Sequence, residues 1–101
     1  MVEIIWTDPA LAELDTVADY IAFDNPKAAQ RLVRRIFSGV EQLARFPKSG
    51  SKVPEWPRSA YRQLVIKPCR VFYRCEGKKV FIVFVMRSER LFQKKFLSTE
   101  R

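Results

Sequence analysis

Apolar residues follow a strand pattern at the start of the chain and then two helix patterns. Residues 2–7 alternate and are β-branched, which predicts a short first strand. A helix follows, because Thr7 or Asp8 can cap its first turn and Pro9 suits its first position. Asp24-Asn25-Pro26 repeats this order and predicts a second helix that ends at Phe46-Pro47. The apolar stripes are Leu11, Leu14, Val17, Ala18 and Ile21, then Leu32, Val33, Ile36, Phe37, Val40, Leu43 and Ala44.

The second half of the chain returns to strand patterns. Three runs, 60–66, 70–75 and 79–86, are separated by the turns Lys67-Pro68 and Glu76-Gly77-Lys78, so neighbouring strands should pair antiparallel. Residues 80–86 are apolar on both faces, which predicts a central strand of the sheet. Ser88 can cap a last short helix, in which Leu91 and Lys95, and Phe92 and Phe96, lie four positions apart.

These elements predict a single α+β domain, residues 1–101, in the order β-α-α-β-β-β-α. The two helices should form an N-terminal hairpin that packs on a mainly antiparallel four-stranded sheet. Its core is expected where the hairpin meets the sheet, at Leu14, Ile21, Leu32, Ile36, Val40, Ile82 and Phe84.

Cysteine and histidine usage restricts the chemistry. Cys69 and Cys75 fall six positions apart on one predicted strand, roughly 20 Å, which is too far for a disulfide. The chain has no histidine, so we expect no metal site. The longest apolar run, 80–86, is too short to span a membrane, and the N-terminus lacks the features of a signal peptide. The expected location is therefore cytoplasmic.

Charge is distributed unevenly along the chain. The net charge is +8, yet residues 1–25 contain six acids and no lysine or arginine. Residues 26–101 therefore carry a net charge of +14. This asymmetry indicates one basic surface that meets a polyanion or an acidic protein. The alternative is that scattered basic residues only keep the chain soluble.

Arginine is the main candidate for chemistry. Phosphate-binding loops and nucleophile elbows are absent from the sequence, and without histidine the usual proton-transfer side chain is missing. Guanidinium groups bind phosphates and aromatic rings stack on bases, so a sheet bearing both is a possible platform for RNA. Equally, the arginines could pair with Glu76 and Glu89 while the aromatics divide between core and rim. The candidate contact residues are Arg62, Arg70, Arg74, Arg87, Tyr61 and Tyr73.

The order of several short motifs resembles the RelE/ParE toxins of bacterial type II toxin–antitoxin systems. The resemblance covers nearly the whole chain, and the motifs of residues 53–74 favour the ParE branch. The motifs are Asp8-Pro9-Ala10, Ala18-Asp19-Tyr20-Ile21, Asn25-Pro26-Lys27-Ala28-Ala29, Leu43-Ala44-Arg45-Phe46-Pro47-Lys48-Ser49-Gly50, Val53-Pro54-Glu55, Tyr61-Arg62-Gln63-Leu64, Arg70-Val71-Phe72-Tyr73-Arg74 and Val83-Phe84-Val85-Met86-Arg87-Ser88-Glu89-Arg90.

The resemblance implies a growth-inhibiting toxin with no cofactor. It also implies a hetero-oligomer with a cognate antitoxin, whose acidic or amphipathic segment wraps the toxin and which alone contacts operator DNA. ParE-like members inhibit DNA gyrase, whereas RelE-like members are endoribonucleases that cut mRNA on the ribosome.

The choice between gyrase and the ribosome as the target depends on whether the chain has a side chain that can transfer a proton. In a ribonuclease, the resemblance would assign Arg62 and Arg87 to the phosphate and Lys52 to the position of a family lysine. Ribonuclease members carry a tyrosine or histidine near the C-terminus, but this chain has Phe92, which cannot transfer a proton. A lysine acting as a base would need a pKa lowered from about 10.4 to near neutrality. Gyrase inhibition is therefore the preferred hypothesis, and a ribosome-dependent endoribonuclease or a non-toxic nucleic-acid-binding module are the alternatives.

Overall fold

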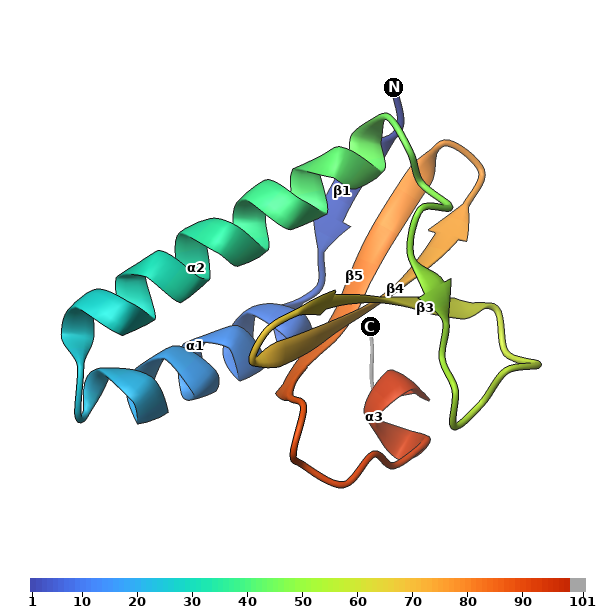
Figure 1. Ribbon diagram of the computed structural model, residues 1–101. Coiled ribbons are helices and arrows are strands. Elements are labelled where there is room, and N and C mark those ends of the chain that lie inside the picture. The colour runs from blue at the N-terminus through green and yellow to red at the C-terminus, as the bar shows by residue number, and fades with distance from the viewer. Residues whose placement is uncertain (99–101) are drawn as a thin grey trace.

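The fold has three layers, with a helical hairpin on one face of a sheet and a short helix on the other. A computed structural model describes residues 1–98, and Figure 1 shows the hairpin and the C-terminal segment on opposite sides of the sheet. The helices are α1 (Asp8–Ala22), α2 (Pro26–Glu41), the 3-10 turn η1 (Gln42–Ala44) and α3 (Lys95–Ser98). The strands are β1 (Glu3–Trp6), β2 (Ser51–Lys52), β3 (Tyr61–Ile66), β4 (Cys69–Glu76) and β5 (Lys79–Arg87).

The sheet confirms the predicted α+β class with one strand more than expected. Its order is β1-β5-β4-β3-β2, in which only the β1–β5 pair is parallel. The predicted sheet of four strands omitted β2, because this strand is only two residues long and no alternation can mark it. As predicted, β5 lies inside the sheet, between the N-terminal strand and β4.

Both predicted helix starts are confirmed by their caps. Thr7 accepts the Ala10 N–H at 3.3 Å, and its own hydroxyl donates to the carbonyl of Ile82 at 2.7 Å. The Asn25 side chain accepts the N–H of Ala28 at 3.1 Å. A side-chain acceptor at this position satisfies an N–H that the helix itself leaves unpaired. The Thr7 hydroxyl therefore also ties the start of α1 to β5.

The predicted helix starting at Ser88 is wrong in its extent. Helix α3 begins only at Lys95, after turns and an irregular stretch in residues 88–94. Contacts with the sheet hold this segment instead of helical hydrogen bonds: the Phe92 ring lies 5.5 Å from that of Phe72, and the Arg90 guanidinium lies 5.8 Å from the centre of the Phe84 ring. Tertiary packing thus overrides the local helix signal.

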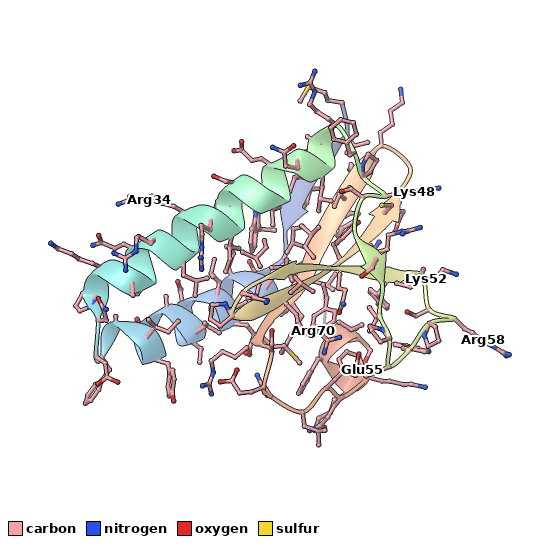
Figure 2. All side chains as sticks on the ribbon, in the orientation of Figure 1. Arg34, Lys48, Lys52, Glu55, Arg58 and Arg70 are labelled. Carbon is pink, nitrogen blue, oxygen red and sulfur yellow. The ribbon has the colours of Figure 1, made fainter. Side chains whose placement is uncertain are left out.

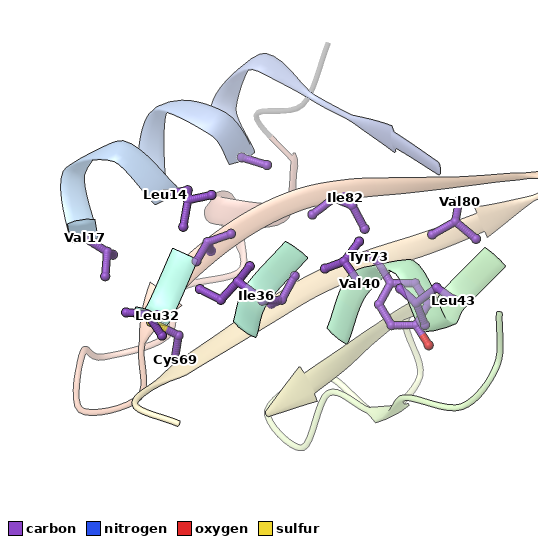
Figure 3. Packing of buried hydrophobic residues seen from close by; sticks show 13 residues of the cluster. Leu14, Val17, Leu32, Ile36, Val40, Leu43, Cys69, Tyr73, Val80 and Ile82 are labelled. Atoms are coloured by element: carbon purple, nitrogen blue, oxygen red, sulfur yellow. The ribbon is translucent and has the colours of Figure 1, made fainter. Parts of the chain in front are cut away.

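The main core lies between the hairpin and the sheet, as predicted. Leu14, Leu32, Ile36, Val40 and Ile82 are all buried there, and Figure 3 shows α2 side chains directed between α1 and the strands. Ile21 is only partly buried at the edge of this cluster. Ile36 is fully buried at the centre of α2.

Phe84 corrects the predicted core, because it lies on the opposite face of the sheet. In the β4–β5 pair, Phe72 is opposite Phe84 and Tyr73 is opposite Ile82, so Val83 is an extra residue in β5. Such a bulge breaks the alternation of a strand. Val83 and Phe84 both join the second cluster, under α3, together with Phe72 and Phe96. Simple alternation from Ile82 had placed Phe84 under the hairpin.

We expect Ile36→Ala to lower the free energy of unfolding by about 2–5 kcal/mol, since it removes a fully buried side chain and leaves a cavity. Leu91→Ala is the matched control, because Leu91 is 80% exposed and its loss should cost less than about 0.5 kcal/mol. Urea unfolding followed by circular dichroism measures both. Equal losses in the two variants would contradict the assignment of the core.

Candidate functional site

The predicted arginines do not share one surface, because strand alternation divides them between the two faces. Arg70 and Arg74 lie on the α3 face, where Tyr61 is opposite Arg74. Arg62 and Arg87 lie on the hairpin face, opposite Tyr73 and Cys69 respectively. The single arginine and aromatic platform predicted from the sequence is therefore absent from residues 1–98.

Arg70 is engaged by the protein itself. Its guanidinium forms two hydrogen bonds with the Glu55 carboxylate, at 2.7 and 2.8 Å, and two with the Gln63 amide oxygen, at 2.6 and 2.9 Å. It also lies over the rings of Phe72, at 4.8 Å, and Phe92, at 5.7 Å. Figure 2 shows Arg70 and Glu55 beside the C-terminal segment. Arg70 thus joins the 53–60 loop to the sheet and leaves little of its side chain for a target.

The Arg70–Glu55 contact also sets the ionisation of the carboxylate. Hydrogen bonds from Arg70 hold the pKa of Glu55 below its usual value, against a smaller opposing effect of burial. Glu55 and Gln63 were not predicted as partners of Arg70, although Glu55 belongs to the Val53-Pro54-Glu55 motif. Only the fold places Glu55 beside an arginine 15 residues further along the chain.

Lys52 and Arg62 are brought together, as the ribonuclease hypothesis requires. They are opposite each other in the β2–β3 pair, and Arg62 donates to the carbonyl of Gly50 at 2.8 Å. A recess of about 250 Å3 lies here, with no acidic side chain in its lining. It could hold an anion such as a phosphate. Its lining residues are Lys48, Lys52, Ser59, Ala60, Tyr61, Arg62 and Cys75.

Arg87 lies far from this recess. Arg87 pairs with Cys69 of β4, and Cys69 pairs with Ile66 of β3. Ile66 is four residues along β3 from Arg62, so the two arginines lie two strands and four residues apart. With about 3.3 Å per residue and about 4.8 Å between strands, the two arginine Cα atoms are roughly 16 Å apart. The Arg87 guanidinium lies 4.0 Å above the Tyr20 ring and pairs with Glu89 at 3.0 Å. Between them on this face, Leu64 and Val71 pack in the core cluster that also contains Ile36 and Val40 of α2.

Phe92 occupies a packed position on the other face. Its ring lies 5.5 Å from Phe72 and 6.4 Å from Phe96. Because Arg62 and Arg87 are on the hairpin face, Phe92 is separated from both arginines by the sheet. The three positions compared with ribonuclease residues therefore do not converge in this structure.

The two predicted contact tyrosines have structural contacts. Tyr61 donates its hydroxyl to the Leu97 carbonyl at 3.0 Å and holds α3 on the sheet. Tyr73 is fully buried and accepts the Gly50 N–H at 2.9 Å. This burial raises the pKa of Tyr73, and it removes Tyr73 from the contact set. A Cβ at Gly50 would lie 2.6 Å from the Tyr73 hydroxyl, so only glycine fits there.

The cysteines are free, as predicted, and both lie in β4. Burial raises the pKa of Cys69 to about 11, so its thiol stays protonated near neutrality. Within residues 1–98, no cluster of three potential metal ligands occurs, and no helix is long and apolar enough to cross a membrane.

The helical hairpin on a five-stranded sheet is similar to the fold of a solved toxin–antitoxin structure. A solved structure described as the chromosomal ParDE TA system from P. aeruginosa is similar, with a TM-score of 0.73 and 27% identity, over 88% of this chain and 98% of that chain. Residues 4–92 match the family described as the ParE toxin of the type II toxin–antitoxin system parDE, and the chain belongs to this family. It is also 34% identical to Toxin RelE2 of Caulobacter vibrioides over 93 residues, which cover 90% of this chain and 100% of RelE2.

We expect the stabilising effect of the Arg70–Glu55 pair to depend on pH. Because the pKa of Glu55 is lower in the folded chain, its contribution is complete above the ordinary value of 4.5 and is lost as pH falls through the folded pKa. The free energy of unfolding of Glu55→Gln should therefore lie below that of the parent at pH 6, by about 1 kcal/mol or less, and approach it at pH 3.

The matched control is Glu41→Gln, since Glu41 is exposed and forms no ion pair within residues 1–98. The difference in free energy of unfolding between Glu41→Gln and the parent should stay small from pH 6 to pH 3. A difference for Glu55→Gln that does not change between pH 6 and pH 3 would show that the carboxylate charge plays no part.

Proposed function

We propose that the chain is a cytoplasmic, growth-inhibiting toxin that a cognate antitoxin neutralises. Membership of the ParE toxin family supports this, as does the similarity to a structure described as a ParDE system. The partner is an acidic or amphipathic antitoxin segment, because residues 26–101 carry a net charge of +14. Opposite charges accelerate the encounter of two proteins and specify the partner. Operator DNA is recognised through the antitoxin.

We further propose that the target is DNA gyrase, which the toxin inhibits by binding rather than by cutting nucleic acid. The observation that carries this proposal is the separation of Arg62 from Arg87, roughly 16 Å at Cα. Cleavage of RNA needs a phosphate held by several groups at once, with proton transfer at both ends. Phe92 supplies no proton, and its ring packs on the α3 face.

A ribosome-dependent endoribonuclease is the second candidate, because one observation favours it. Lys52 and Arg62 share a recess that lacks acids and could hold a phosphate. The similar Caulobacter protein also carries the name RelE2. The lining of the recess contains no histidine and no carboxylate, so this candidate requires a lysine as base.

The charge asymmetry predicts that antitoxin association slows as salt is added. The association rate of a cognate antitoxin with the toxin is measured by stopped flow across a NaCl series. Between about 0.05 and 0.5 M NaCl the rate should fall by about tenfold or more, since steering by charge is screened. A rate independent of ionic strength would argue against electrostatic steering.

Purified toxin should inhibit gyrase supercoiling and leave mRNA on translating ribosomes intact. Arg62→Ala and Arg87→Ala should change only the affinity for gyrase, and with it the inhibitory concentration. The loss of binding free energy should be a few kcal/mol at a hot spot and almost nothing elsewhere. Arg58→Ala is the matched control, because Arg58 is an exposed loop cation. A site-specific cut on the ribosome that Arg87→Ala slows by about 10²–10³-fold would overturn gyrase as the target.

A further inference from the structure

Helix α2 carries a row of exposed cations on the side opposite its buried residues. The basic residues recur at intervals of three and four, which places them on one side of a helix. The buried residues of α2, Ala29, Leu32, Ile36 and Val40, lie on the opposite side. Figure 2 shows Arg34 pointing outward from this helix. The exposed cations are Lys27, Arg31, Arg34 and Arg35.

The β3–β4 turn adds a fifth cation to this row. Arg35 donates to the carbonyl of Lys67 at 2.7 Å, which fixes the turn against the helix. The helix and β3 approach closely at Gly39, where an added Cβ would lie 2.7 Å from the Ile66 side chain. We call these five exposed residues the α2 ridge: Lys27, Arg31, Arg34, Arg35 and Lys67.

The charges of the α2 ridge are uncompensated. Within the described residues 1–98, none of its members forms an ion pair, whereas Arg70, Arg74, Arg87 and Arg90 each pair with a carboxylate. Asp19 of α1 lines the same cleft as Arg34 but forms no ion pair with it. Like charges held side by side repel each other, so a polyanion would relieve a repulsion that the protein leaves in place.

We propose that the α2 ridge binds the phosphates of duplex DNA without reading its sequence. A duplex carries about one charge per 1.7 Å of axis, and the row from Lys27 to Arg34 spans about 10 Å of helix. None of the five ridge residues is aromatic, and single strands are bound largely by stacking on aromatic rings. This inference goes beyond the proposed function, because it concerns the free toxin with no gyrase present.

The test is fluorescence anisotropy of a labelled duplex of about 20 base pairs with the intact toxin, from about 50 to 200 mM NaCl. Arg31→Ala/Arg34→Ala should weaken binding by about tenfold or more at the lowest salt. It should also reduce the slope of log K against log salt by about 2, one for each lost phosphate contact. Both positions are exposed and alanine favours helix, so circular dichroism should show an unchanged fold.

The matched control is Arg58→Ala/Lys78→Ala, which removes the same charge from exposed positions outside the ridge. Full retention of the slope by this control supports the ridge. An equal loss in both double variants would show that only net charge matters and would overturn the inference. Failure of the parent to bind the duplex, or tighter binding to a single strand or to polyglutamate, would overturn it as well.

Supercoiling assays separate this inference from the proposed target. Toxin that binds the duplex through the ridge yet fails to inhibit gyrase overturns gyrase as the target and supports the ridge. Toxin that inhibits gyrase but binds the duplex no more weakly after Arg31→Ala/Arg34→Ala overturns the ridge alone.

Discussion

Burial of β4 and β5 on both faces is the constraint on which the rest of the structure depends. Val71, Tyr73 and Ile82 turn one way, while Phe72 and Phe84 turn the other, and all are buried. Apolar surface of this extent must be covered on both sides of the sheet. The helical hairpin covers one side with two long helices. The other side is covered by the segment after β5, which includes the single turn of α3, and by Val53 and Trp56 of the loop before β3.

The short C-terminal segment holds its face of the sheet with cations as well as with apolar contacts. Arg90 lies over Phe96, at 4.5 Å, and pairs with Glu13 of α1 at 3.2 Å. Lys94 lies over Trp56 at 5.0 Å, so the segment also touches the 53–60 loop. Cations on aromatic rings contribute about 0.5–1 kcal/mol each at exposed sites. Arg70 over Phe72 and Arg74 over Phe81, two arginines that the sequence presents as candidates for a target, are part of the fold in the same way.

The sequence predicts what depends on neighbouring residues and fails where distant contacts decide. The caps at Thr7 and Asn25, the hairpin and the alternation of β3 follow from local rules, and all are observed. The conformation of residues 88–94 does not follow from local rules, because contacts with aromatic rings of the sheet hold these residues out of a helix. The candidate site was harder still. Each arginine was found, but its face of the sheet and its partner depend on pairing, as Glu55 beside Arg70 shows.

Because of the bulge at Val83, the faces of the residues that follow in β5 depend on how the strand pairs with β4 rather than on its number of residues. Val83 has no partner of its own in β4, and Phe84 beyond it pairs with Phe72. A relative with one residue fewer at this point could pair regularly and still direct Phe84 to the same side. The same sequence without the bulge would instead exchange the faces of every residue from Phe84 to Arg87. Loss of one residue at the bulge would therefore keep the faces of the strand, whereas a substitution that straightens the strand would move Arg87 to the α3 face.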